Sequence, residues 1–391
     1  MRQGRSPHRA LLSSIRRALF LLTLAGLAAQ SAPALAAQDE QDQPLVTTPV
    51  AMERPSQPRN DFRDQYLFRF EFDNDTFLGD DNSFTAGWSF QFFSRLDDEW
   101  APGYKKWIGK VPGLGDDGRD GRVTRWAWGL SQVIITPNDI SIETPQPNDA
   151  PWAGILGIAS SWEAYDNRRM AALQAFLGCQ GPCSGAESVQ KYIHQNLGFG
   201  EPPAGWDNQL AQKAIFNAHY EYRYKVYAPA AERYFTPRRF THDFSVGGQG
   251  AVGNFVTVAR AQVEYRFGWG LPMGFTKVPD PAGWGIMLDP IYVNPVAPLP
   301  SEAARWRAYF TIMLRQSWFA YQAPSEGGPT ESGYNHPKTR PYPADSETIL
   351  GFHLARIPFA VHVTYFRYMD PQNDATESKT DWVNLSFEYR F

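Results

Sequence analysis

The stretch QYLFRFEFDND, residues 65–75, is followed after a polar turn by FTAGWSFQFF, residues 84–93. In both halves aromatic residues alternate with charged, polar or small ones, which is the two-residue period of a β-strand. A soluble sheet would bury the aromatic face. A membrane β-barrel instead turns aromatic side chains toward lipid and charged ones toward a polar lumen. The two ends of the chain decide between these architectures.

Residues 1–37 have the features of a secretory signal peptide. An Arg-rich start precedes an apolar stretch over residues 18–29, and Ala34-Leu35-Ala36 has the small-residue pattern of a cleavage site. The apolar stretch is shorter than the ~20 residues that a membrane-spanning helix needs. Cleavage would remove five Arg and no acidic residue, so the net charge would fall from −4 to −9. This charge argues against a nucleic-acid partner, which favours a basic surface.

The C-terminal residues 383–391 alternate in the same way, and the chain stops on Phe391. A terminal aromatic residue that closes an alternating strand resembles the assembly signal of bacterial outer-membrane barrels. The aromatic content of 15%, with 13 Trp, also fits the aromatic girdles of such barrels. We therefore predict an antiparallel β-barrel in the bacterial outer membrane. A periplasmic β-sandwich is the alternative.

The predicted organisation is a disordered lead-in over residues 38–62 and one barrel domain over residues 63–391, with about twelve strands. The predicted strands are residues 65–75, 84–93, 123–135, 152–162, 170–178, 213–227, 240–251, 255–267, 304–319, 347–356, 359–369 and 382–391. A short helix is expected near residues 104–108. Segments 268–300 and 324–345 are predicted loops, one of which could plug or cover the lumen.

A second predicted helix, between strands, carries the first candidate for chemistry. Ser184 and Glu187 have the spacing of a capping box, and Gly198 suits the helix end. Gln190 and His194 lie one turn apart, so they face the same way. The only two cysteines, Cys179 and Cys183, precede the helix. A disulfide suits an exported protein, but two unpaired small residues remain an alternative.

The other histidines of the mature chain are weaker candidates. His219, His242, His353 and His362 lie in strand patterns, where packing or a place in the lumen is the simpler interpretation. His336 lies in a loop beside Pro337.

Five short motifs follow one another along the chain. They are Asn74-Asp75 with Phe84-Thr85-Ala86-Gly87, Gln132-Val133-Ile134-Ile135-Thr136-Pro137, Asp149-Ala150-Pro151-Trp152-Ala153-Gly154, Gly181-Pro182 leading to Gln190 and His194, and Gly205-Trp206-Asp207-Asn208-Gln209-Leu210. In this order they resemble the motifs of the outer-membrane lipid A 3-O-deacylases of the LpxR type.

The resemblance implies a twelve-stranded barrel that hydrolyses the ester-linked acyl chain at the 3-position of lipid A. It also implies a calcium requirement, lipopolysaccharide and outer-membrane lipids as partners, and a monomer. The implied roles are His194 as general base, Gln190 as its support, Asn74, Asp75 and Thr85 as site-lining residues, and Asp75, Asn74 and Glu201 as calcium ligands.

The residue types suit this chemistry. Ester hydrolysis needs a base that works near neutral pH, which an imidazole supplies, acting on water or on a hydroxyl such as that of Thr85. It also needs positive charge or a donor where the oxyanion forms, and a calcium ion held by carboxylate and amide oxygens would provide it. Taken alone, Asn74-Asp75 would be turn-forming residues, Thr85 a lumen-facing strand residue and Gln190 a solvated helix residue.

Three departures weaken the match. Ala150 stands where the family has Arg, Glu201 aligns only loosely with the family's acid, and no Lys occurs between Lys110 and Lys191, where the family has one. Two alternatives have other signatures. An outer-membrane phospholipase would carry His-x-Ser-Asn-Gly, which is absent here, and the smaller His/Ser-type lipid A deacylases are disfavoured for the same reason. A porin-like barrel would need no catalytic residue.

Overall fold

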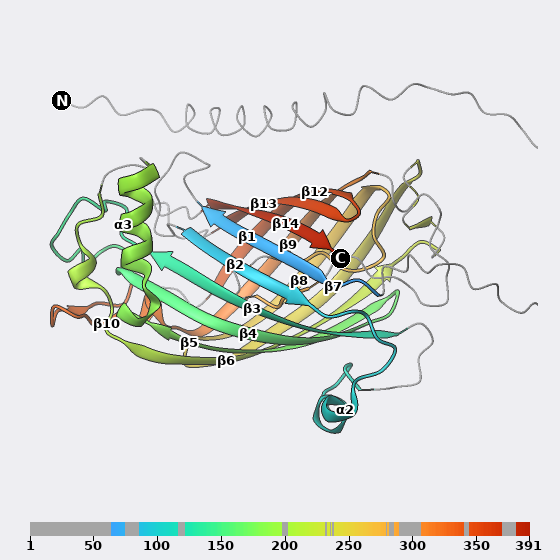
Figure 1. Ribbon diagram of the computed structural model, residues 1–391, viewed down its shortest axis with the longest axis horizontal. Coiled ribbons are helices and arrows are strands. Elements are labelled where there is room, and N and C mark those ends of the chain that lie inside the picture. Colours follow the sequence, from blue (N-terminus) through green and yellow to red (C-terminus); the bar gives the residue numbers. More distant parts are fainter. Residues whose placement is uncertain are drawn as a thin grey trace, which may run out of the picture. The chain divides into compact units, whose positions relative to one another are not determined.

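The computed structural model describes residues 64–74, 86–115, 122–197, 202–230, 233, 234, 236, 238–278, 280, 285–288, 306–339, 344–369 and 381–391. Twelve strands of this part close into one antiparallel barrel in the order β1-β14-β13-β12-β9-β8-β7-β6-β5-β4-β3-β2 (Figure 1). The predicted strand count and architecture are therefore confirmed. No helix among these residues is both long and apolar enough to cross a membrane.

The barrel strands are β1 Leu67–Asn74, β2 Ala86–Phe93, β3 Val123–Ile135, β4 Ala153–Tyr165, β5 Arg169–Gln180, β6 Lys213–Tyr227, β7 Phe240–Gly253, β8 Val256–Trp269, β9 Arg307–Gln322, β12 Ala344–Arg356, β13 Phe359–Met369 and β14 Asp381–Arg390. The remaining elements are α2 Pro102–Ile108, α3 Ala186–Leu197, three short 3-10 turns (Pro182–Ser184, Trp206–Asn208 and Pro324–Glu326) and a two-stranded sheet of β10 Gly328–Pro329 and β11 Asn335–His336. Strands β3, β6 and β13 have the predicted bounds.

Because neighbouring strands are antiparallel, the connections between them lie alternately at one end of the barrel and at the other. The connection that carries α3 lies at the end where β1, β3 and β5 finish, which we call the helix end (Figure 1). The opposite end, the terminus end, holds the start of β1 and the end of the chain, where the amide of Tyr66 donates to the carbonyl of Phe391 at 3.0 Å. Asn74, the last residue of β1, therefore lies at the helix end.

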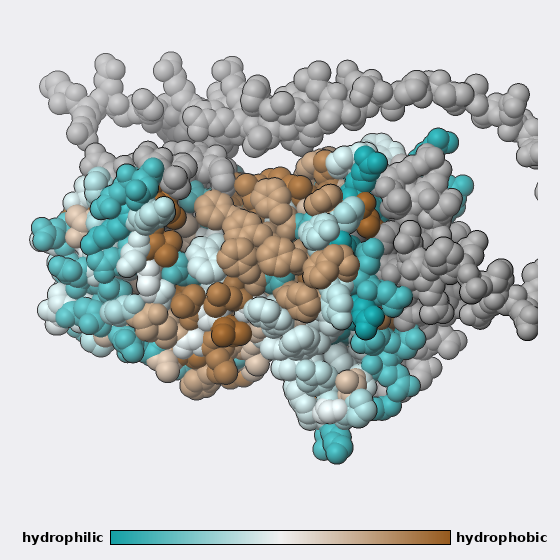
Figure 2. Space-filling view, in the orientation of Figure 1, coloured by the Kyte–Doolittle hydropathy of each residue, from teal (hydrophilic) through white to brown (hydrophobic). Residues whose placement is uncertain are grey.

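Burial follows the predicted alternation. On β1 the side chains of Arg69, Glu71 and Asp73 are fully buried, whereas Phe68 is 39% exposed, and Phe90 on β2 is 43% exposed. The charged set therefore points into the lumen and the aromatic set points outward, as a membrane barrel requires. Figure 2 shows the resulting hydrophobic band over the middle of the strands, with hydrophilic surface around α3.

The lumen is filled by part of the β8–β9 connection. We call residues 271–288 the plug segment; its described residues are 271–278, 280 and 285–288. Inward side chains of the barrel hold it by ion pairs and by hydrogen bonds to its carbonyls. These contacts are Arg69 Nη2 to the Leu288 carbonyl at 2.7 Å, Gln174 Nε2 to the Gly285 carbonyl at 2.9 Å, Arg223 Nη1 to the Thr276 carbonyl at 2.6 Å, Arg260 and Arg315 with Asp280 at 2.7 and 2.5 Å, and Lys277 with Glu71.

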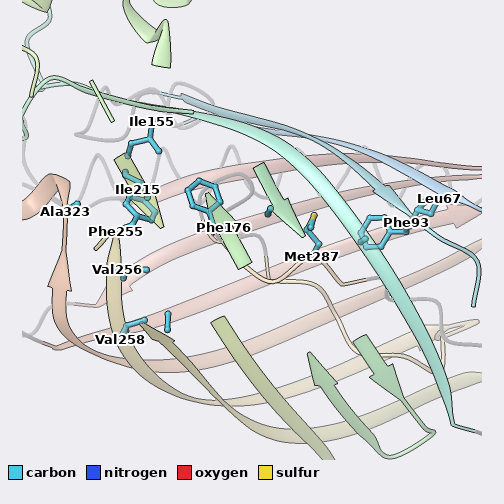
Figure 3. Close-up of a cluster of buried hydrophobic side chains, with 13 residues drawn as sticks. Leu67, Phe93, Ile155, Phe176, Ile215, Phe255, Val256, Val258, Met287 and Ala323 are labelled. Atoms are coloured by element: carbon cyan, nitrogen blue, oxygen red, sulfur yellow. The ribbon is translucent and has the colours of Figure 1, made fainter. Parts of the chain in front are cut away.

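Apolar side chains complete the filling. Met287 of the plug segment belongs to a buried cluster with inward residues of the strands, among them Phe93 and Phe176 (Figure 3). The expectation that the loop over residues 268–300 could plug the lumen is therefore confirmed for its described part. Sequence patterns could not show which of the two long loops enters, because the contacts join residues up to hundreds of positions apart.

The plug segment predicts that the protein does not conduct ions. We expect no current steps when the purified protein is added to a planar lipid bilayer, because charged side chains and the plug segment occupy the lumen. A variant in which residues 272–287 are replaced by a short Gly/Ser linker should conduct. Steady conductance through the wild-type protein would contradict the plug and support a porin.

Candidate active site at the helix end

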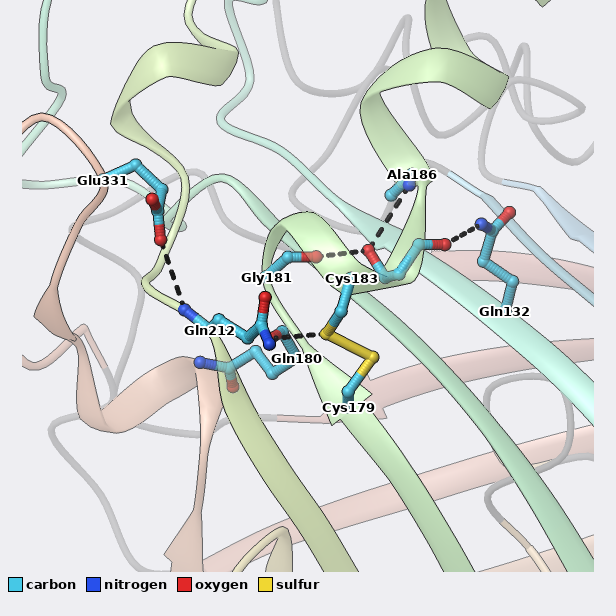
Figure 4. The surroundings of a disulfide bond; sticks show 9 residues. Gln132, Cys179, Gln180, Gly181, Cys183, Ala186, Gln212 and Glu331 are labelled. Carbon is cyan, nitrogen blue, oxygen red and sulfur yellow. Dashed lines mark hydrogen bonds between the residues drawn. A yellow bond between two sulfur atoms is a disulfide. The ribbon is translucent and has the colours of Figure 1, made fainter.

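The inserted helix α3 is fixed to the barrel by a short rigid connection after β5. A disulfide joins Cys179, on β5, to Cys183, in the 3-10 turn Pro182–Ser184, with their Cα atoms 6.2 Å apart, within the usual range (Figure 4). Of the two alternatives left open for these cysteines, the structure contains the disulfide. Gly185 then takes a left-handed conformation, with φ of 66°, which glycine adopts without strain. The chain therefore leaves the barrel and enters α3 along one defined path.

The predicted capping box is wrong in its details. The Ser184 hydroxyl donates to the Gly181 carbonyl at 2.7 Å and accepts from the Ala186 amide at 3.3 Å. Glu187 does not reach back to Ser184; its carboxylate pairs with Lys191 one turn along, at 2.6 Å. The left-handed residue between Ser184 and the helix moves the start of α3 to Ala186, out of register with the box. Gly198, the predicted end residue, lies outside the described residues.

The base of α3 rests on the outer wall of the barrel. A Cβ built on Gly154, which shares the outward parity of the 58% exposed Ile158, would collide with the side chains of Ser184 and Ala186. Gln132, on the outward face of β3, donates from Nε2 to the Ser184 carbonyl at 2.6 Å (Figure 4). Its Oε1 accepts from the Trp88 indole of β2 at 2.8 Å. The helix is therefore attached to the outward face of the wall, at its rim.

Strand register connects this base to Asn74. The paired residues Asn74, Ala86, Ile134 and Gly154 form one row across β1, β2, β3 and β4 at the helix end. Three strand spacings of about 4.8 Å put the two ends of the row about 14 Å apart. Asn74 shares its parity with the exposed Phe68, so it belongs to the outward set and is half-buried. Thus the start of α3 and Asn74 lie along the same outer rim.

Gln190 and His194 share the buried face of α3, as predicted. Gln190 is 2% exposed, and its Oε1 accepts from the indole Nε1 of Trp206 at 2.7 Å. His194 is half-buried, and the opposite face carries Tyr192, which is 65% exposed. The Nε2 of Gln190 and the Nδ1 of His194 are buried atoms without a hydrogen-bond partner in the described part of the chain. Two unused polar atoms on one helix face mark this surface as a candidate site.

Trp206, which contacts Gln190, packs against Trp152 next to this helix face. Their rings are 5.1 Å apart, and both are almost fully buried. A Cβ on Gly205 would lie 2.5 Å from the Trp152 Nε1, so only glycine fits before Trp206. Asn208 ties the same turn to the Glu143 carbonyl and the Ser332 hydroxyl, each at 2.7 Å.

Asp75, Thr85 and Glu201 lie outside the described residues, so the structure places Asn74 alone among the expected calcium ligands. Within the described ranges no group of three or more His, Cys, Asp or Glu side chains has metal-binding geometry. Four of the other histidines behave as expected. His219, His353 and His362 are buried inside the barrel, and His242 is half-buried in β7. His336, expected in a loop, is buried in the short strand β11, where it pairs with Gly328.

Sequence reasoning missed the roles of Gln132 and Trp206, although both lie in the quoted motifs. A signal was present for Gln132, because it is a polar residue in the outward set of β3, among Trp126, Trp128 and Leu130. A lipid-facing position should be apolar, so an amide there indicates a contact with something outside the wall.

Comparisons with known proteins identify the family of the chain. The model of the family described as "Outer membrane protein LpxR" matches residues 19–391. Among solved structures, LpxR from Salmonella typhimurium is similar with a TM-score of 0.60 and 12% identity, covering 83% of this chain and 100% of that one. The β domain of the Bordetella autotransporter BrkA has a TM-score of 0.38 and 10% identity, covering 84% and 98%. No curated protein sequence matches the chain.

Proposed function

The chain belongs to the family of the outer membrane protein LpxR, and on that basis we propose that it hydrolyses the ester-linked acyl chain at the 3-position of lipid A. It is thus a transmembrane β-barrel of the bacterial outer membrane. One observation carries the proposed activity: the helix with His194 and Gln190 is attached to the outer wall, while the lumen is filled. Such a site meets a lipid that diffuses in the membrane, and a solute in a channel would not reach it.

In the proposed reaction His194 is the general base. It takes a proton from the attacking water and later returns it to the leaving alkoxide. In the alternative in which the Thr85 hydroxyl attacks, the acyl group first passes to the Thr85 oxygen as the alkoxide leaves, and water then hydrolyses this new ester. Gln190 supports the site as a hydrogen-bond donor. Asn74, Asp75 and Thr85 are the proposed site-lining residues, and Asn74 lies on the same outer rim as the start of α3. The ester bond breaks to release a fatty acid and to leave a hydroxyl on the 3-position of the lipid.

Calcium is part of the proposal. The amide oxygen of Asn74 and the carboxylates of Asp75 and Glu201 would hold it, and these hard oxygen donors are the ligands that calcium prefers. Asn74 suits this role because its half-buried side chain lies on the outer rim that also carries the start of α3. When bound, the ion would supply positive charge close to the developing oxyanion.

The alternatives predict different substrates. A phospholipase would act on glycerophospholipids, and a porin would leave every lipid unchanged and conduct ions. The plug segment disfavours the porin.

The proposal is tested by lipid A from cells. Expression in a bacterium whose lipid A keeps its 3-position acyl chains should shift the lipid A mass by the loss of one chain, seen in mass spectra of extracted lipid A. Cells with an empty vector are the control. An unchanged lipid A spectrum, with the protein folded in the outer membrane, would contradict the proposal.

A further inference from the structure

The contact between Trp206 and Gln190 fixes which way the Gln190 amide points. Oxygen and nitrogen of an amide are normally hard to distinguish, and their placement depends on partners. An indole N–H can only donate. The amide atom that lies 2.7 Å from Trp206 Nε1 must therefore be the acceptor Oε1. Gln190 Nε2, the donor, then points away from Trp206.

The fixed donor has no partner in the described part of the chain. Gln190 Nε2 is buried, as is the unpartnered Nδ1 of His194 on the same helix face. A buried polar atom without a hydrogen bond costs about 1–3 kcal/mol, so a ligand atom that supplies the missing bond would bind favourably there. An acceptor that arrives with the substrate would satisfy Nε2, and an ester carbonyl is such an acceptor.

Trp206 is itself held in place. It packs on Trp152, Gly205 allows the close approach before it, and Asn208 bonds two neighbouring segments. Rotation of the indole would break this packing. The direction of its N–H is therefore set by the surrounding structure and not by Gln190.

We propose that Trp206 is a positioning residue that locks the side-chain amide of Gln190, so that Nε2 donates to the substrate ester beside His194. This inference rests on the proposed function, since the ester belongs to that substrate. Without the indole N–H, the amide can flip and present its oxygen, which would repel the carbonyl oxygen. Trp206 acts only through Gln190 and does not itself touch the substrate.

The test is a double-mutant cycle on purified enzyme. Trp206→Phe keeps a ring and removes the donor, and should lower kcat about tenfold with little change in KM, as expected for loss of one oriented hydrogen bond. Gln190→Ala should lower kcat at least as much. The double variant should be no slower than Gln190→Ala, because Trp206 has no other route to the reaction.

Two further variants sharpen the result. Gln190→Glu can still accept from Trp206 but has no Nε2 donor, so it should be as slow as Gln190→Ala. Trp100→Phe is the matched control, because it removes an indole that donates to the Leu114 carbonyl, also at 2.7 Å, near α2 on the β2–β3 connection. It should leave kcat unchanged. Additive losses in the double variant, or an active Gln190→Glu enzyme, would overturn the inference.

A measurement without turnover separates this inference from the proposed function. The indole proton of Trp206, followed by NMR in ¹⁵N-Trp-labelled protein, should exchange slowly with solvent and should exchange faster in Gln190→Ala. Unchanged exchange in that variant would overturn the positioning contact. A wild-type enzyme that leaves lipid A intact while this difference is present would overturn only the proposed function.

Discussion

Replacement of His194 by Ala should lower lipid A deacylation by about 10²–10⁴-fold, the usual contribution of a general base. His194 is half-buried on the inward side of α3, and its Nδ1 has no hydrogen-bond partner among the described residues. His194 lies on α3, outside the closed sheet, so the barrel should still form after the replacement. The initial rates of the wild-type and variant enzymes would be measured on purified lipid A, from the amount of fatty acid released.

Two controls belong to this experiment. The barrel of the variant should keep the heat-dependent gel mobility typical of folded outer-membrane barrels. His242→Ala removes a half-buried imidazole from the start of β7, at the terminus end, and should retain the wild-type rate. A His194→Ala enzyme with wild-type activity would remove His194 from the mechanism.

Removal of calcium should silence the enzyme. After treatment with EGTA we expect a rate lower by about 10²–10³-fold, comparable to the loss of a principal oxyanion stabiliser. The proposed ligands are Asn74, Asp75 and Glu201. Asp75→Asn removes one carboxylate and should raise the calcium concentration needed for half-maximal rate.

Added calcium should restore the rate, and magnesium should do so poorly, because magnesium needs shorter bonds and stricter octahedral geometry. Gel mobility before and after EGTA shows whether the barrel itself survives. Full turnover after rigorous metal removal would contradict the calcium requirement. Gln190 would then be the proposed donor to the oxyanion, with His194 still the general base.

The barrel was predictable because its signal is local and repeated. From Phe68 to Phe72 in β1 and from Val383 to Tyr389 in β14 every second residue is aromatic or aliphatic, and burial in the structure follows that parity. The predicted and observed strands differ mainly at their ends. For example, β12 begins at Ala344, whereas the prediction began at Glu347. The first three residues of β12, 344–346, are Ala, Asp and Ser, which do not show the apolar alternation of a strand. They belong to the strand because their backbone pairs with β9.

The filling of the lumen and the place of α3 were harder to predict. Asp280 meets Arg260 and Arg315, and Gln132 meets Ser184, by closure of the barrel and by loop paths that no local pattern encodes. The spacing of Gln190 and His194 did predict their shared face. Sequence alone could not show that this face would lie over Trp206 outside the wall.

The proposed activity is tested most directly by offering the purified enzyme two lipids at once. Mixed micelles would contain hexa-acylated lipid A and phosphatidylethanolamine, with calcium, and mass spectrometry would follow both. We predict that lipid A loses one ester-linked acyl chain from its 3-position while the phospholipid stays intact. Formation of lysophospholipid with unchanged lipid A would contradict the account and identify a phospholipase.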